Sequence, residues 1–139
     1  MKLRKVTYGD WKILLNWRNE PTTRKNSFEQ KEIPESTHKL WFNDSLINPY
    51  KKIYILEDNL TPVGYIRSDN LLTNEYTLSW SIASDQRGKG YGTKILKLFL
   101  QDKTGKFIAE IKPENTASIK MVQNNGFEKL DRTKYVKEQ

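Results

Sequence analysis

Alternating and helical patterns of apolar residues divide the chain into short strands and helices. Residues 76–83 alternate between large apolar side chains and small side chains that are mostly polar. This period of two predicts a strand with one apolar face and one polar face. From Tyr91 the apolar residues Ile95, Leu98 and Phe99 recur at helical spacing, which predicts that a helix follows the strand.

The same patterns predict the rest of the chain. Further strands are expected at 3–6, 52–57, 63–68, 106–111, 127–130 and 134–136, and further helices at 11–17, 36–48 and 115–125. Asp10, Ser36 and Asn115 are the expected N-caps, and Gly126 is the expected glycine after the last helix. The polar segment 22–31 follows a proline and is expected to be a loop. This order predicts one mixed α/β (α+β) domain over residues 1–139.

Three glycines separate the strand at 76–83 from the helix that follows it, in the sequence Arg87-Gly88-Lys89-Gly90-Tyr91-Gly92. The start of a helix has unpaired N–H groups and a positive dipole end, and glycine lets a phosphate approach the backbone. Spacing excludes a P-loop, and Thr93 stands where the dinucleotide fingerprint needs its third glycine. Two interpretations remain, a plain turn and a diphosphate cradle, and the basic helix favours the cradle.

Composition narrows the chemistry. The chain has no cysteine and one histidine, which excludes a disulfide and a thiolate nucleophile and makes a metal site unexpected. Its formal charge of +7 suits an anionic ligand, but the lysines are scattered and no nucleic-acid-binding signature is present. Because no apolar run is long enough to span a bilayer, we expect no membrane partner and a cytoplasmic protein.

Two motifs give a resemblance to a known family. Arg87 to Gly92 resembles the acetyl-CoA pyrophosphate loop of the GNAT superfamily of N-acetyltransferases. Asn115-Thr116-Ala117-Ser118, followed by a helix and Gly126-Phe127, resembles a second motif of that family in the same order. The resemblance covers the chain from end to end. It implies a central, mostly antiparallel sheet flanked by helices, in which two parallel central strands splay apart.

The resemblance also implies how acetyl-CoA is bound. The cosubstrate should lie between the splayed strands at 77–83 and 106–111. The residues implied in its binding are Ile82, Ala83, Arg87, Gly88, Lys89, Gly90, Tyr91, Gly92, Asn115 and Ser118. Asn115 also has a purely structural interpretation as an N-cap, and the two roles are compatible.

The sequence indicates the catalytic groups less clearly than the residues that bind the cosubstrate. Family members often place a tyrosine acid seven residues after the asparagine, where this chain has Val122. Water, Tyr91 or Tyr135 could replace it. Glu110 is the candidate general base, since burial on its strand would raise its pKa, and an ion pair with Lys112 or another surface lysine is its alternative role. With no cysteine to carry the acetyl group, direct transfer is expected.

The N-terminal half resembles one branch of the family, which acetylates UDP-4-amino-4,6-dideoxy sugars. The resemblance lies in the segment 17–21, in Thr23-Arg24 and Ser27, and in His38 with Trp41-Phe42. It implies that a UDP-amino sugar contacts Arg18, Asn19, His38 and Ser79. The same elements occur in acetyltransferases of protein N-termini, which remain an alternative, as does a non-catalytic coenzyme A-binding module. A homodimer is compatible with the sequence but not decided by it.

Overall fold

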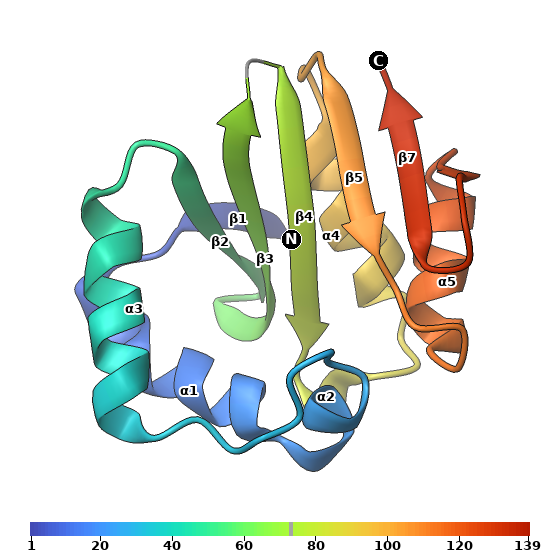
Figure 1. The fold of residues 1–139 in the computed structure, drawn as a ribbon. Coiled ribbons are helices and arrows are strands. Elements are labelled where there is room, and N and C mark those ends of the chain that lie inside the picture. The colour runs from blue at the N-terminus through green and yellow to red at the C-terminus, as the bar shows by residue number, and fades with distance from the viewer. Residues whose placement is uncertain (73) are drawn as a thin grey trace.

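One seven-stranded sheet runs through the molecule in the order β1-β2-β3-β4-β5-β7-β6 (Figure 1). The computed structural model describes residues 1–72 and 74–139. The strands are β1 (Lys2–Lys5), β2 (Lys51–Asp58), β3 (Thr61–Leu72), β4 (Glu75–Ile82), β5 (Lys106–Glu110), β6 (Glu128–Lys129) and β7 (Lys134–Glu138). Neighbours pair antiparallel except β4 and β5, which pair parallel. The predicted α+β domain with a mostly antiparallel sheet is confirmed.

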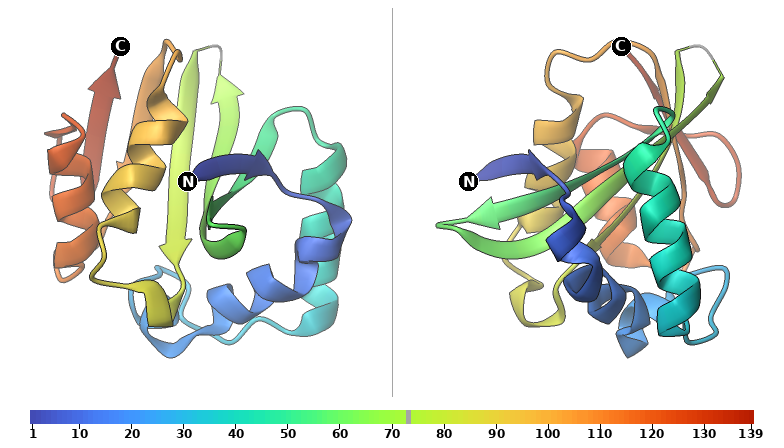
Figure 2. Two further views of the ribbon diagram at one scale, coloured as in Figure 1. Left: turned by 180° about the vertical axis from the view of Figure 1, so that it is seen from behind. Right: turned by 90° about the vertical axis from the view of Figure 1, so that its left-hand side faces the viewer.

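Helices cover the two faces of the sheet unequally. The α-helices are α1 (Trp11–Asn19), α2 (Pro21–Lys25), α3 (Glu35–Ile47), α4 (Tyr91–Leu100) and α5 (Thr116–Asn124), with short 3₁₀ turns η1 (Tyr8–Asp10) and η2 (Ser84–Gln86). α4 and α5 lie behind the sheet in Figure 1, while α1 and α3 lie at the side of β2 and β3 (Figure 2). No described helix lies in front of β5 and β7 (Figure 1). We call this front side the polar face.

The alternation along β4 builds two cores. Leu78 points toward α4 and α5 and belongs to the larger core with Ile95, Phe99 and Phe107. On the opposite face Thr77 is exposed and the Ser81 hydroxyl lies 3.2 Å from that of Thr23 in α2, while Ala83, just after the strand, belongs to the second core. The predicted split of this strand into an apolar and a polar face is therefore confirmed.

The parallel strands part before they end. β4 pairs with β5 only from Glu75 to Leu78, opposite Lys106 to Ala109, although β4 continues to Ile82. On its other edge β4 stays paired with β3 as far as Ile82. Backbone groups alternate in direction along a strand, and Ala83 N donates to Val63 O on the β3 side. The peptide groups of Trp80 and Ile82 therefore point into the fork between β4 and β5.

Several local predictions need correction. Pro21 does not begin a loop but occupies the first turn of α2, where its missing N–H costs nothing. Asp10 makes no cap hydrogen bond to α1, because its carboxylate binds Arg4 and Thr7. Ser36 lies inside α3, whose N-cap is Pro34.

The strand boundaries also shift. The predicted turn at 58–59 lies one residue later, because Asn59 and Leu60 have positive φ. The predicted turn at 69–74 is shorter, since β3 extends to Leu72, and position 73 lies outside the described residues.

Two predictions at the ends of α5 are confirmed. The Asn115 side chain accepts a hydrogen bond from Ser118 N at 3.2 Å, as an N-cap does. Gly126 has φ +82°, and the amides of Gly126 and Phe127 bond back to Gln123 O and Val122 O. This is the Schellman pattern, which glycine favours because the left-handed conformation costs it little.

Candidate active site

A cleft of about 540 Å³ opens where β4 leaves β5, at the end of the sheet that carries the glycine turn. We call it the main cleft. Its lining includes residues from β4, the glycine turn, α2 and α5: Thr22, Thr23, Asn26, Trp80, Ser81, Ile82, Gln86, Arg87, Gly88, Gly90, Tyr91, Gly92, Thr93, Asn115, Ala117, Ser118, Lys120, Met121 and Asn124. Eight of the ten residues implied in cosubstrate binding are among them. Ala83 is buried, and Lys89 Nζ donates to Gln86 Oε1, on a residue of the lining, at 3.1 Å.

The glycine turn presents bare backbone to the main cleft. Gly88 and Gly90 have φ of +78° and +82°, and a Cβ added to either would have no atom within 4 Å. Gly90 is the N-cap of α4 and supplies no side-chain cap, so first-turn amides of a ten-residue helix are left for another partner. Gly92 is needed for packing, because a Cβ there would lie 2.4 Å from Met121 Sδ. The turn therefore fits a diphosphate.

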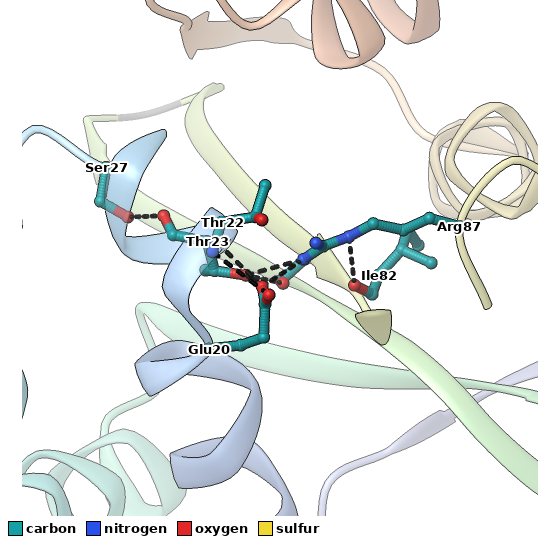
Figure 3. A network of polar contacts seen from close by, with 7 residues as sticks. Glu20, Thr22, Thr23, Ser27, Ile82 and Arg87 are labelled. Atoms are coloured by element: carbon teal, nitrogen blue, oxygen red, sulfur yellow. Dashed lines mark hydrogen bonds and ion pairs between the residues drawn. The ribbon is translucent and has the colours of Figure 1, made fainter. Parts of the chain in front are cut away.

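Arg87 connects this turn to α2 (Figure 3). Its Nη2 donates to Glu20 Oε2 at 2.8 Å and to Thr23 Oγ1 at 2.9 Å, while its Nε donates to Ile82 O at 3.2 Å. The Thr23 hydroxyl also lies 3.2 Å from Ser81 Oγ. One arginine thus ties the end of β4 and the glycine turn to a helix from the other end of the chain.

Glu20 is the anionic centre of that network. It also accepts hydrogen bonds from the backbone amides of Thr22 and Thr23, and so caps α2. Desolvation alone would raise the pKa of Glu20, but the hydrogen bonds from Arg87, from the two amides and from the Thr23 hydroxyl lower it to about 2. The carboxylate is therefore ionised at neutral pH.

The start of α5 forms the opposite wall. Trp80 Nε1 donates to Ser118 Oγ at 3.1 Å, and Ser118 N donates to Asn115 Oδ1. Both residues implied in cosubstrate binding on α5 are thus held by the fold itself. Lys120 also lines the cleft and supplies a cation on the same wall.

Sequence patterns missed the contribution of α2. Thr22, Thr23 and Asn26 line the main cleft, although this polar segment was expected to be a loop. Its usable signal was the pair Glu20-Pro21, an acidic cap before a proline in the first helical turn.

Glu110 ends β5 beside the fork. Thr77 pairs with Ile108 in parallel register, so side chains two residues further on, Ser79 and Glu110, project from the same polar face. Glu110 is exposed rather than buried, and among the described residues it makes no ion pair. Ser79 is half-buried beside the fork and does not line the main cleft.

The other residues implied in substrate binding lie away from the main cleft. His38 is fully buried, with its ring nitrogens 2.9 Å from Arg18 Nη1 and 2.7 Å from Trp11 O. Burial lowers the pKa of His38, and the nearby Arg18 charge lowers it further. Asn19 bonds through both side-chain atoms to the backbone of Ile33. These contacts give all three residues a structural role.

The alternative proton donors are also placed. The Tyr91 hydroxyl donates to Asp58 Oδ2 at 2.5 Å, a bond that raises the pKa of the phenol. Tyr135 and Val122 are buried in the larger core.

Two further findings concern metals and membranes. Among residues 1–72 and 74–139, no cluster of three or more histidine, cysteine or acidic side chains could hold a metal ion. Within the described helices, none has the length and apolar character needed to cross a bilayer.

The structure thus combines a forked pair of parallel strands with a glycine turn that has no side-chain cap. The sequence matches the model of the acetyltransferase (GNAT) domain over residues 1–128, and the chain belongs to this family. It is therefore an acetyltransferase, and the predicted use of acetyl-CoA as cosubstrate is confirmed at the level of the family. A search of curated protein sequences gives no significant match.

Solved structures agree on the fold. A domain from Methanocaldococcus jannaschii is 24% identical, with 99% of this chain and 97% of that chain covered and a TM-score of 0.83. Spermidine N-acetyltransferase from Vibrio cholerae, in complex with CoA and spermine, is 16% identical, with coverages of 97% and 90% and a TM-score of 0.81. The aminoglycoside acetyltransferase AAC(6')-Ib, in complex with coenzyme A and kanamycin, is 20% identical, with coverages of 99% and 94% and a TM-score of 0.82.

Proposed function

We propose that this protein transfers an acetyl group from acetyl-CoA directly to a primary amine, and that the amine is the 4-amino group of a UDP-linked deoxy sugar. The observation that carries the transfer is the fork between β4 and β5 with the uncapped glycine turn at its mouth. The amine nitrogen bonds to the acetyl carbon as the carbon–sulfur bond breaks, and one proton leaves the nitrogen while one reaches the sulfur.

The residues of the main cleft fit acetyl-CoA, which supplies the activated acetyl thioester. Gly88, Gly90 and the first turn of α4 would hold the pyrophosphate through backbone amides. The Trp80 and Ile82 peptide groups, which point into the fork, would hold the pantetheine arm, and Asn115 faces them from α5. An unpaired N–H at this position can polarise a carbonyl as an oxyanion hole does.

Glu110 is proposed as the general base, because an attacking amine must be neutral. It stands on the polar face beside the last paired residues of β4 and β5, where an acceptor can approach the fork. Its exposure lets it act through a water, and Ser79 on the same face could help to hold that water.

The acceptor site is proposed to lie on the polar face next to Ser79. Arg67, which pairs with Ser79, and Arg18 both contact the Trp41 ring, with Cζ atoms 5.5 and 4.0 Å from its centroid. Arg67 Nε and Asp69 Oδ1 are buried without a hydrogen bond, although the two side chains form an ion pair at 3.4 Å. Buried polar atoms without partners invite a polar ligand.

The charge of this region favours an anionic acceptor over a polyamine. Arg67 forms an ion pair with Asp69, whereas Arg18 bonds to His38, whose lowered pKa keeps it neutral at pH 7. A diphosphate attached to the sugar would balance the excess positive charge, whereas spermidine or an aminoglycoside would add to it. This supports a nucleotide-linked amino sugar.

Release of free CoA, measured with a panel of amines, tests the proposal. The panel holds a UDP-4-amino-4,6-dideoxy sugar, N-terminal peptides, spermidine and kanamycin, and turnover is expected with the first. Replacing Arg67 by glutamine should raise the KM for the UDP sugar about tenfold and leave acetyl-CoA affinity unchanged. Arg132→Gln, an exposed turn position, is the matched control.

Each other outcome is informative. Turnover confined to peptides would show that the acceptor is a protein N-terminus and not a UDP-linked sugar. Turnover confined to polyamines would refute the anionic acceptor. Binding of acetyl-CoA by calorimetry without turnover of any amine would indicate a non-catalytic module, and a folded sample that binds no acetyl-CoA at millimolar concentration would refute the enzyme itself.

A further inference from the structure

A second cavity lies at the other end of the sheet, on the side covered by α4. It measures about 320 Å³. We call it the tyrosine–lysine pocket. Its lining residues are Pro49, Tyr50, Lys52, Tyr54, Ser68, Asn70, Asn74, Tyr76, Phe99, Lys103 and Thr104. Its lining includes residues from the start of β2 and from the end of α4.

This pocket is separate from the main cleft. Tyr76 lines the pocket and Ile82 lines the cleft, and the two are six residues apart on one strand. At the rise of an extended chain they are about 20 Å apart. The two cavities share no lining residue.

A serine hydroxyl lines the pocket. Ser68 is 5% exposed as a residue, and its oxygen is not among the fully buried polar atoms that lack a partner. Since Ser68 lines the cavity, its hydroxyl is available to a ligand there.

Two cations border the same space. Lys103 lies over the Phe99 ring, with Nζ 4.4 Å from the centroid, and it also faces Tyr54 at 5.9 Å. Burial lowers the pKa of Lys103, and the like charge of Lys52 lowers it further. No described lining residue is a carboxylate, so the two lysines have no anionic partner within the pocket.

The walls are aromatic. Tyr50, Tyr54 and Tyr76 line the cavity, with Phe99 behind them. Tyr76 stacks on Phe107 at 5.2 Å and Tyr54 meets Phe99 edge-on at 6.0 Å, so both tyrosine rings are held in place by the core. Fixed aromatic walls favour a planar ring through stacked or edge-on contacts. A volume near the lower end of ligand sites, about 300 Å³, admits one ring with one small substituent.

We propose that the tyrosine–lysine pocket binds a small aromatic anion, a single ring that carries a carboxylate or a phosphate. The ring lies between the tyrosines, and the anionic group meets Lys52, Lys103 and the Ser68 hydroxyl. This site is independent of acetyl transfer, because none of its residues contributes to the fork or to the glycine turn. The ligand needs both an aromatic ring and an anionic group, because the walls contact a ring and the lysines attract a negative charge.

Four probes separate the two contributions: phenyl phosphate, benzoate, inorganic phosphate and phenol. By calorimetry with the full chain, at least one aromatic anion should bind about tenfold or more tighter than inorganic phosphate and phenol. The stronger of phenyl phosphate and benzoate identifies the preferred anionic group. Amide chemical shifts in an NMR titration should change around Ser68 and Tyr54 and stay constant at Gly90. Saturating CoA should not displace the probe.

Variants test the residues. Lys52→Gln combined with Lys103→Gln, and separately Ser68→Ala, should weaken binding of the aromatic anion by about tenfold or more. Lys94→Gln combined with Lys97→Gln removes the same charge from exposed positions of α4 and should change affinity by less than about twofold. The proposal is overturned if neither aromatic anion binds at millimolar concentration, if the two double-lysine variants weaken binding equally, or if the shifts map to the main cleft.

Discussion

Arg87 and Glu20, 67 residues apart in the sequence, form an ion pair of 2.8 Å that holds the glycine turn against α2. The arginine beside the two glycines with positive φ, Gly88 and Gly90, is thereby fixed by the fold. The same carboxylate caps α2, whose residues line the main cleft. One acidic residue therefore positions both the glycine turn and α2.

Glu20→Gln should destabilise the protein by about 1–2 kcal/mol at neutral pH, because the charged hydrogen bonds to Arg87 and to the α2 amides weaken. The pKa of Glu20 falls from 4.5 to about 2 on folding, so its contribution is complete above pH 4.5 and is lost as the pH falls toward 2. Urea denaturation across this window should show wild type and variant converging. Glu114→Gln changes an exposed position, and the difference between its free energy of unfolding and that of wild type should stay constant across this window. If the stability of both variants converged with that of wild type at low pH, the loss could not be assigned to Glu20.

Gly90 and Gly126 provide a matched pair, because both have φ +82°. Replacing either by alanine should cost about 1–2 kcal/mol of stability, since a side chain is strained in the left-handed conformation. Only Gly90 lines the main cleft, so only its replacement by alanine, and more strongly by valine, should weaken acetyl-CoA binding. Calorimetry measures this. An affinity for Gly90→Val within about twofold of wild type, roughly 0.4 kcal/mol, would leave the turn without a binding role.

Glu110→Gln should lower kcat by about 100-fold or more, because the variant keeps the size of the side chain but cannot accept a proton. Acetyl-CoA affinity should not change, since Glu110 does not line the main cleft. Glu138→Gln is the control: it is exposed on the same face, paired with Lys106 at the far end of the ladder. Near-normal kcat for Glu110→Gln from about pH 6 to 9 would exclude a general-base role.

His38 should make stability depend on pH near neutrality. Burial lowers its pKa below the ordinary value of 6.5, so the unfolded chain binds more protons in that range. The free energy of unfolding should therefore fall as the pH drops through about 6.5. His38→Gln should lose about 2–4 kcal/mol through its buried hydrogen bonds and abolish this slope. His38 is the chain's one histidine, so an unchanged pH dependence of stability in the variant would show that other titratable groups cause it.

Leu60→Gly should stabilise the protein. Asn59 and Leu60 have φ of 50° and 68°, the conformation of a two-residue hairpin turn that favours Asn-Gly. Leu60 is 81% exposed, so glycine relieves strain without loss of packing, and we expect a gain of about 0.5–1 kcal/mol. Leu130 is 64% exposed and does not have positive φ, so Leu130→Gly should destabilise instead. Thermal unfolding compares the two.

Predictions from the sequence succeeded where the cause is local. The cap by Asn115 and the glycine after α5 depend on residues within one turn of the helix, and the alternation along β4 reports its two faces directly. The boundary at Pro21 was wrong for a related reason: a proline that ends one helix can begin the next, and only the Glu20 cap distinguishes the cases.

Partners distant in the sequence were not predictable. Nothing near Arg87 indicates that Glu20 will neutralise it, and nothing near His38 indicates that it will bond to Arg18 and Trp11 O. The sequence left open whether Glu110 is a buried base or a surface ion-pair partner. It is exposed because β5 ends there and no described helix covers that face.

The fork has a mechanical consequence. Four residue pairs between β4 and β5 are the only ladder that joins strands β1–β4 to strands β5–β7 in the described sheet. The sheet thus has two parts joined by this short ladder, and the contact between α4 and α5 lies behind them. Because β4 lines the main cleft on one side and α5 lines it on the other, a change in the angle between the two parts of the sheet would change the width of the cleft.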